Sequence, residues 1–310
     1  MKVVNIITNI QNGAGLQRDA ELFAALLEKL GHRPRLIAYD RPHKGIQYPA
    51  DINLFMEVML PDFLHHGREN YLVPNSEWWD AKRFNSVLPA ISKVLCKTHD
   101  CYRIWEQKLP GRCVYTGFES IDFSDNIPSS DKQNNFLHLA GASSTKNSHA
   151  VIDAWRQFRI PYDLEFVIRD ISFIPRCVGV PNVRHRTRLP EEHVRQALNL
   201  RQFHIMPSHY EGFGHAIHEA LGCGGIVLTT DAPPMNEFAG VPKELLIPSC
   251  RTWPKEFAVC HEVSPAAVYE AVMKAAEMSQ SRRSELSVAA RIAFLKDRED
   301  FRTKIAEIFS

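Results

Sequence analysis

The sequence lacks the cysteine patterns that mark disulfide frameworks and thiolate metal sites. Its seven cysteines are scattered, odd in number and never spaced as Cys-x-x-Cys. This distribution argues against a disulfide-stapled extracellular protein and against a zinc site made of thiolates. We therefore expect a protein that works in a reducing compartment, the cytoplasm.

Long apolar runs and a dominant sign of charge are missing as well. No apolar run approaches the roughly 18 residues of a membrane-spanning helix, and the first ten residues do not resemble a signal peptide. The 37 basic and 36 acidic side chains leave a formal net charge of +1. The overall charge therefore indicates neither a polyanionic partner nor an anionic membrane surface, although a local basic face stays open.

The length of 310 residues suits two domains of roughly 150 residues each. Residues 124–135 are polar, contain a proline and carry almost no apolar side chain, so we interpret them as an interdomain linker. The predicted organisation is an N-terminal domain at 1–123, a C-terminal domain at 136–296, and a final helix at 297–310 that crosses back to the first domain.

Short β-branched or apolar runs alternate with helical segments on both sides of this linker. The expected strands are 3–8, 35–39, 52–58, 71–73, 93–96, 112–116, 136–140, 164–168, 203–206 and 225–230. Strands that alternate with helices indicate parallel, doubly wound sheets. The predicted fold class is α/β, with two Rossmann-like domains facing across a cleft. Ligands of such sheets bind beyond the carboxyl ends of the strands.

One segment, "PSHYEGFGHAIHEALGCGG" at 207–225, concentrates unusual chemistry. It follows a predicted strand, and its glycines at 212 and 214 let the backbone come close to a ligand. The first turn of the helix that follows has free N–H groups that can meet an anion. Glu211 precedes this helix and Glu219 lies one to two turns inside it. A diphosphate with hydroxyl-rich groups on either side, as in a nucleotide sugar, fits such a surface.

The segment resembles the signature of retaining glycosyltransferases of the GT-B fold and the family-four type. That signature has Pro-Ser, then Tyr-Glu-Gly-Phe-Gly, and a second glutamate after seven intervening residues. The matching positions are Pro207-Ser208, Tyr210 to Gly214 and Glu219-Ala220, and the similarity continues through 222–238 to Glu237. Weaker similarity is seen at 139–155, where a strand, a loop and Lys-Asn open the second domain, and at "NGAG" (12–15) with Gly31-His32 in the first.

The resemblance implies roles for individual residues. Glu211 would contact the transferred sugar, Glu219 the donor ribose and Lys146 the diphosphate, so that Glu211 and Lys146 form the catalytic pair. The other implied donor-binding residues are Gly13, Gly15, Gly212, Phe213, Gly214 and His215, and we add Arg169, at the end of the strand 164–168, as a further donor-binding candidate. The implied acceptor side consists of Asn75, Glu77 and Trp78.

Two positions depart from the family pattern. Gly141 and Ala142 stand where the family usually has an arginine, and Arg169 is a candidate for the missing charge. Asn75 and Glu77 follow the strand whose end often carries a histidine in the family. These departures leave open a protein that binds a nucleotide sugar but has impaired transfer.

The resemblance also implies a mechanism without cofactor or metal. The leaving nucleoside diphosphate departs and the acceptor hydroxyl arrives from the same face, and fixed positive charge stabilises the leaving group. The substrate would be a UDP- or GDP-linked sugar. His218-Glu219 does not continue into a His-Glu-x-x-His zinc motif because Gly222 occupies the last position, and "NGAG" lacks the third glycine of a dinucleotide-binding loop.

The acceptor is less defined by the sequence. The balanced charge favours a saccharide or lipid-linked acceptor over nucleic acid, and no oligomeric state is indicated. A lower-ranked alternative is a glycosyltransferase that acts on modified DNA bases, because "KRFN" at 82–85 and the neighbouring Trp78 form a local basic and aromatic edge. In the final helix, Phe301, Ile305 and Phe309 form an apolar stripe that we expect to pack against the N-terminal domain.

Overall fold

The computed structural model of the protein describes residues 1–9, 15–39, 43, 46–141 and 143–310. Within these residues the chain divides into two compact units. Unit 1 comprises Met1–Glu119, Pro254–Ala258 and Arg298–Ser310, and unit 2 comprises Ser120–Trp253 and Val259–Asp297. The chain therefore passes from one unit to the other after residues 119, 253, 258 and 297.

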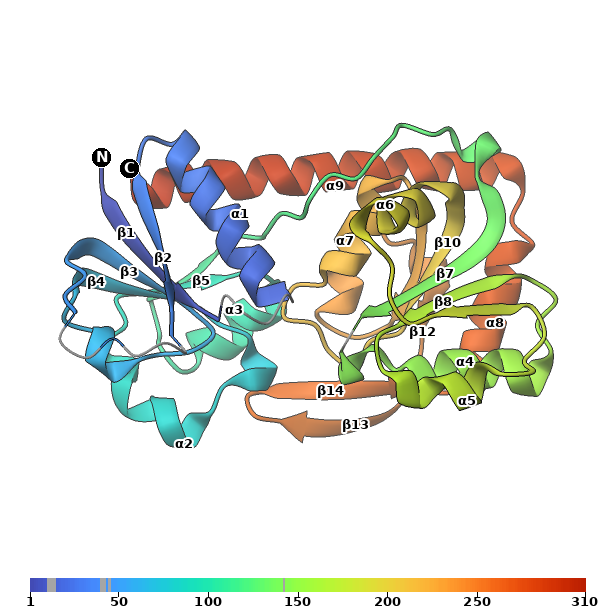
Figure 1. Cartoon of the computed structure of the whole chain (residues 1–310), viewed down its shortest axis with the longest axis horizontal. Helices are drawn as coiled ribbons and strands as arrows, with labels where there is room; N and C mark the ends of the chain where they lie inside the picture. Colours follow the sequence, from blue (N-terminus) through green and yellow to red (C-terminus); the bar gives the residue numbers. More distant parts are fainter. Residues whose placement is uncertain (10–14, 40–42, 44–45, 142) are drawn as a thin grey trace. The chain divides into compact units, whose positions relative to one another are not determined.

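Unit 1 is built on a parallel sheet whose described strands have the order β2-β1-β3-β4-β5-β6 (Figure 1). The strands are β1 Val3–Thr8, β2 Arg33–Ala38, β3 Ala50–Met56, β4 Gly67–Val73, β5 Lys93–Cys96 and β6 Cys113–Tyr115. The helices are α1 Gly15–Lys29, α2 Ala81–Phe84 and α3 His99–Glu106. Helix α1 buries Leu16, Ala20, Phe23 and Leu27, whose three- and four-residue spacing keeps them on one face.

Unit 2 repeats this architecture with the strand order β12-β11-β10-β7-β8-β9, again with parallel pairs throughout the described strands. The strands are β7 Gln133–Gly141, β8 Leu164–Ile168, β9 Val183–Arg186, β10 Arg201–Met206, β11 Ile226–Thr230 and β12 Leu246–Ile247. The helices are α4 Ser148–Phe158, α5 Ile174–Cys177, α6 Glu191–Leu200, α7 His215–Gly222 and α8 Pro265–Ala276.

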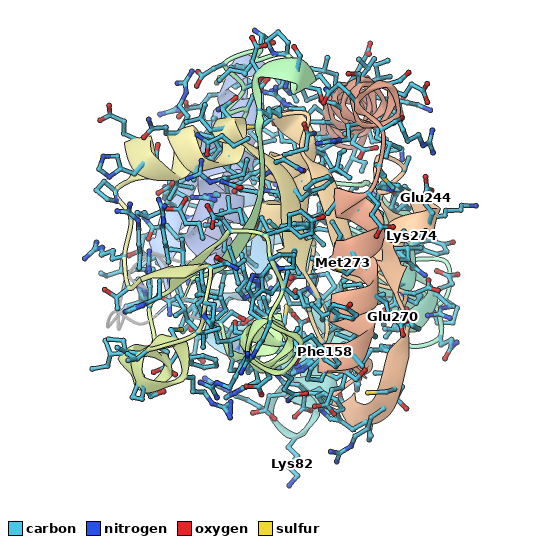
Figure 2. The ribbon with its side chains drawn as sticks, turned by 90° about the vertical axis from the view of Figure 1, so that its right-hand side faces the viewer. Lys82, Phe158, Glu244, Glu270, Met273 and Lys274 are labelled. Atoms are coloured by element: carbon cyan, nitrogen blue, oxygen red, sulfur yellow. The ribbon has the colours of Figure 1, made fainter. Side chains whose placement is uncertain are left out.

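Helices α4 and α8 pack on each other beside this sheet (Figure 2). Phe158, the last residue of α4, stacks on Tyr269 of α8 with ring centroids 4.7 Å apart. In Figure 2 the labelled Phe158 lies next to the α8 turn that carries Glu270. Every residue of β11 is buried, as expected for a strand of a parallel sheet that is covered on both faces.

Two elements contribute residues to both units. The hairpin β13 Ser249–Lys255 and β14 Ala258–Val263 places its tip in unit 1, where Phe257 packs on Trp105 at 5.7 Å and on Trp79 at 6.2 Å. Helix α9, Gln280–Phe309, buries Phe294 in unit 2. Its last turns belong to unit 1, where Phe301 contacts Phe23 at a centroid distance of 5.5 Å.

The predicted α/β class with two Rossmann-like units is confirmed. Two local predictions are wrong. The strand expected at 52–58 ends at Met56, because Glu57 adopts a left-handed φ of 68° that a strand cannot contain. Residues 133–135 of the expected linker belong to β7, which begins at Gln133. Strand β9 and the β13–β14 hairpin were not predicted, and no helix in the described part of the chain is both long and apolar enough to cross a membrane.

Candidate active site

The strand order of unit 2 creates a crevice at the carboxyl ends of β7 and β10. The chain builds outward from β7 through β8 to β9, then returns to place β10 on the other side of β7. The winding of the sheet therefore changes direction between β7 and β10, and doubly wound sheets bind ligands at the carboxyl ends of the strands at such a switch point. Both sequence segments singled out for chemistry, at Lys146 and at Glu211, lie in the loops that follow these two strands.

The loop after β7 presents Lys146 at the end of a short 3-10 helix, Ser144–Lys146. Ser143 caps this turn, since its hydroxyl accepts a hydrogen bond from the Thr145 N–H at 3.3 Å. Asn147 follows with a left-handed φ of 49°, a conformation that asparagine tolerates better than most residues, and α4 begins directly after it. The backbone thus fixes where the Lys146 side chain starts.

The loop after β10 carries Ser208 and Glu211. The Thr230 hydroxyl donates to the Ser208 carbonyl at 2.7 Å, and the His209 N–H donates to the Thr145 carbonyl at 2.8 Å. The second bond joins the loop of β10 to the loop of β7. Ser208 then donates its hydroxyl to Glu211 Oε1 at 2.5 Å, so the Glu211 carboxylate is held from its own loop.

Lys146 and Glu211 form an ion pair across the two loops, between Nζ and Oε1. Their side chains keep only 13% and 11% of their exposure, so water screens the pair much less than it would a surface pair. The small remaining exposure also means that a ligand in the crevice can still reach both groups. An ammonium and a carboxylate fixed side by side can contact a phosphate and a sugar hydroxyl of one molecule.

His138, on β7, lies beneath this pair and is fully buried. Burial lowers the pKa of His138 to about 4, and the nearby positive charge of Lys146 acts in the same direction. Its Nδ1 donates to the Ile205 carbonyl at 2.7 Å, and its Nε2 accepts the Ser148 hydroxyl at 2.8 Å. His138 is therefore neutral at physiological pH and adds no positive charge to the crevice.

Helix α7 begins at the same end of the sheet. Gly214 precedes it with φ of 106°, and no side chain of its own N-cap residue satisfies the first turn. Backbone N–H groups at such a terminus attract an anion. The Phe213 side chain is buried against Phe238 and His218, so it anchors the loop. His215 Nδ1 lies 2.7 Å from the Ser120 hydroxyl.

We expect Gly214→Ala to destabilise the protein by about 1–3 kcal/mol, because an alanine cannot adopt this φ without strain. Its Cβ would also lie 3.2 Å from the Phe238 ring. Urea unfolding measures the loss. Gly31→Ala is the matched control, because Gly31 has φ of 80° but no heavy atom within 4 Å of an added Cβ. It carries the backbone strain without the close contact, so its loss of stability should be smaller. An unchanged midpoint for Gly214→Ala would show that this backbone conformation is not required.

The remaining predicted site residues divide between the units. In unit 2, Arg169 is exposed directly after β8, and Glu219 is 4% exposed inside α7. In unit 1, Gly15 is the exposed first residue of α1, and Glu77 is buried. The others are Gly212 in the loop before α7, Asn75 and Trp78 after β4, and Gly13, which lies outside the described residues.

Sequence reasoning missed two residues of this crevice. Ser208 was noted within the Pro-Ser motif but not as a partner of Glu211, although a hydroxyl three residues before a carboxylate in a tight loop was an available signal. His138 could not be predicted as a site residue, because a histidine within an apolar strand does not indicate which loop it will contact in the fold. No group of three histidine, cysteine or acidic side chains suited to a metal ion occurs among the residues that the structure describes.

Residues 120–250 match the family profile of the glycosyl transferases group 1. No curated protein matches the chain. Among solved structures, Alr3699/HepE of Anabaena in complex with UDP and glucose aligns over 100% of this chain and 99% of its own, with 15% identity and a TM-score of 0.71. Sucrose-phosphate synthase of Thermosynechococcus elongatus aligns over 100% and 98%, with 12% identity and a TM-score of 0.73. An α-glucosyltransferase in complex with UDP and a DNA 13-mer containing an HMU base aligns over 100% of both chains, with 11% identity and a TM-score of 0.67.

Proposed function

We propose that the protein is a glycosyltransferase that moves a sugar from a nucleotide-diphosphate donor to an acceptor hydroxyl. The observation that carries this proposal is the Lys146–Glu211 pair at the switch point of unit 2. Both residues lie within the 120–250 segment that matches the glycosyl transferase profile. The likeness to a UDP and glucose complex supports the same substrate class.

In the proposed reaction the bond between the anomeric carbon and the diphosphate breaks, and its electron pair stays on the phosphate oxygen. Lys146 and the N-terminus of α7 stabilise this developing charge. Glu211 binds a hydroxyl of the transferred sugar, and Glu219 binds the donor ribose. The acceptor oxygen forms the new bond to the anomeric carbon on the face that the leaving group vacates, and its proton passes to the departing phosphate oxygen. The anomeric configuration is therefore retained, and no metal ion takes part.

The first test is nucleotide binding. Isothermal titration calorimetry with UDP, GDP and ADP is expected to give a Kd for at least one of them within roughly the 1 μM–1 mM range usual for enzyme substrates. Lys146→Met should weaken that affinity at least about tenfold, as loss of a charged hydrogen bond does. Lys274→Met, at an exposed position of α8 (Figure 2), is the control. The absence of binding by all three nucleotides would refute the proposal.

Turnover tests the finer claims. Incubation with the sugar conjugate of the nucleotide that binds should release nucleoside diphosphate slowly to water and faster with an acceptor. Proton NMR of the product reports whether the anomeric configuration is kept. The rate should survive EDTA, and a rate that a chelator abolishes would overturn the metal-independent mechanism.

A nucleotide-sugar-binding protein without transfer is the alternative, motivated by Gly141 at the position of the family's arginine. Gly141 has φ of 58° and accepts the Arg169 N–H at 2.7 Å, so the Arg169 side chain begins at the same edge of the sheet. This placement supports Arg169 as a replacement charge and favours the enzyme. Measured nucleotide binding without any release from the sugar conjugate would favour the alternative.

The fold does not name the acceptor, because the similar structures include sucrose-phosphate synthase and an enzyme bound to DNA. The balanced charge supports a saccharide or lipid-linked acceptor. The lower-ranked DNA acceptor has one local feature: Lys82 and Arg83 are exposed on α2 near Trp78, which is 51% exposed, and Lys82 projects outward (Figure 2). Duplex binding that weakens steeply with salt would support DNA, and its absence would exclude it.

A further inference from the structure

Unit 1 has a switch point of its own, between β1 and β3. The chain places β2 on one side of β1 and then returns to place β3 on the other, so the winding of the sheet changes direction between β1 and β3. By the rule that located the crevice of unit 2, a ligand of unit 1 belongs at the carboxyl ends of these two strands. The residue directly after β3 is Glu57.

Glu57 is held in a costly conformation. Its φ of 68° is rare for a residue with a side chain and costs on the order of 1 kcal/mol or more. Asn75, after the adjacent strand β4, donates its Nδ2 to Glu57 Oε2 at 2.6 Å and fixes the carboxylate. The Glu57 side chain is only partly buried, so the group remains open to a ligand. Backbone strain of this kind is found mainly at functional sites, where it fixes the direction of a side chain.

The charges around Glu57 select against anions. Lys97, after β5, pairs with Asp19 of α1 at 2.7 Å, and both side chains are 3% exposed, so this cation is already neutralised. Glu77 is 5% exposed and adds another carboxylate to the field at Lys97. Lys255 at the hairpin tip lies over the Trp78 ring, with its Nζ 3.3 Å from the centroid. Of the charges that act on Glu57, Lys97 is compensated by Asp19 and Lys255 lies on a ring, while the Glu57 carboxylate itself repels an anionic ligand.

Burial raises the pKa of Glu57, while the Asn75 hydrogen bond and the charges of Lys97 and Lys255 oppose this rise, and Asp19 reinforces it. A carboxylate that has lost part of its hydration gains from any donor that reaches it.

A second polar group at this switch point is short of partners. Thr8 ends β1, is fully buried, and its Oγ1 has no hydrogen-bond partner in the part of the chain that the structure describes.

We propose that Glu57 and Asn75 form the site in unit 1 that binds the acceptor, and that this site takes a neutral, hydroxyl-bearing group and rejects phosphorylated or carboxylated ones. The inference rests on the proposed glycosyl transfer. Glu57 accepts a hydrogen bond from an acceptor hydroxyl, and the Asn75 amide orients the carboxylate. Neither Glu57 nor the exclusion of anions follows from the sequence signature, which lies in unit 2.

The test compares wild type with Glu57→Gln in the full-length protein. The donor is the sugar conjugate of the nucleotide that binds most tightly among UDP, GDP and ADP. The acceptor panel is methyl α-glucoside, maltose and lactose, set against glucose 6-phosphate and glucuronate. Neutral members should stimulate nucleotide release by the wild type. Glu57→Gln should lower this stimulated kcat/KM by about 10–100-fold, as loss of a hydrogen bond to a charged group does, while release to water and nucleotide Kd stay within about threefold.

A matched control and a stability measurement separate binding from a structural role. Glu69→Gln removes an exposed carboxylate near the start of β4, toward the opposite end of the sheet, and should leave all rates unchanged. Because the pKa of Glu57 is raised on folding, its ionisation costs stability above its ordinary pKa. Glu57→Gln should therefore unfold at the same temperature as wild type at pH 7, or at a higher one.

Three outcomes would overturn the inference. One is unchanged acceptor kinetics in Glu57→Gln, and another is a melting temperature that falls together with nucleotide affinity, which would indicate a structural role. The third is a wild type that only the anionic panel members stimulate, or that no member stimulates. A wild type that binds none of the three nucleotides would refute the proposed function itself, so the two failures are distinguishable.

Discussion

Replacing Glu211 by glutamine should lower turnover by about 10²–10³-fold, the usual loss when a preorganised polar group of an active site is removed. The amide keeps the size of the side chain and one oxygen for the Ser208 hydroxyl, but it loses the charge that fixes Lys146. Nucleotide affinity should stay equal or rise, because a negative charge beside the diphosphate has gone. Steady-state kinetics and calorimetry on the same preparation measure both effects.

Two further variants make this result specific. Ser208→Ala leaves the Lys146–Glu211 pair in place and removes one donor to the carboxylate, so we expect a smaller loss of about tenfold. Glu192→Gln, on the exposed face of α6, should be indistinguishable from wild type. If Glu211→Gln turned over within threefold of wild type, Glu211 would have no part in transfer.

Removing one partner of the buried Lys97–Asp19 pair should cost about 3–5 kcal/mol of stability, because the charge that remains in the interior has lost the partner it contacts at 2.7 Å. Asp19→Leu removes the carboxylate that contacts the ammonium, and Lys97→Met removes the ammonium that contacts the carboxylate. The double variant Asp19→Leu/Lys97→Met should recover most of the loss, since neither charge remains. Equal destabilisation by the single and double variants would show that the pair contributes packing alone.

The pH dependence of this pair has a definite sign. Asp19 and Glu77 raise the pKa of Lys97 against the opposing effect of burial. A lysine whose pKa is raised on folding contributes stability that is complete below its unfolded value of about 10.4 and declines as pH rises through the folded value. The wild-type advantage over Lys97→Met should therefore be constant near neutral pH and shrink in strong alkali. Hydrogen exchange with mass spectrometry reports unit 1 peptides separately from unit 2.

The sequence predicted the sheets because each strand is a short apolar run with its own turn signals. The strands at 3–8, 93–96 and 164–168 have the predicted bounds. The hairpin β13–β14 escaped prediction because β13 is mostly exposed and Phe257 at the tip packs on tryptophans distant in sequence. Edge strand β9 escaped for a related reason, since it is largely exposed and carries arginines.

The site was predictable where its chemistry is local. Residues 207–214 hold the carboxylate, the glycines and the serine within one loop. The proximity of Lys146, 65 positions from Glu211, depends on the neighbouring positions of β7 and β10, which no local pattern encodes. Glu57 was not predicted as a site residue, because the expected strand at 52–58 included it, whereas β3 ends at Met56 and Glu57 belongs to the loop that follows. Asp19 gave a usable signal, because it stands three residues after Leu16 and four before Phe23, on the apolar face of α1.

The division of the chain has a consequence for its biosynthesis. Unit 1 includes Arg298–Ser310, and Phe301, Ile305 and Phe309 are fully buried there. A ribosome that has made residues 1–119 has therefore not yet made the side chains that complete the first hydrophobic core. All residues of unit 2 precede residue 298, so unit 2 can mature first, in contrast to the usual order in which the N-terminal domain folds first. The first unit to be translated is therefore the last to be completed, and a chain that stops before residue 298 would lack the three side chains that fill this core.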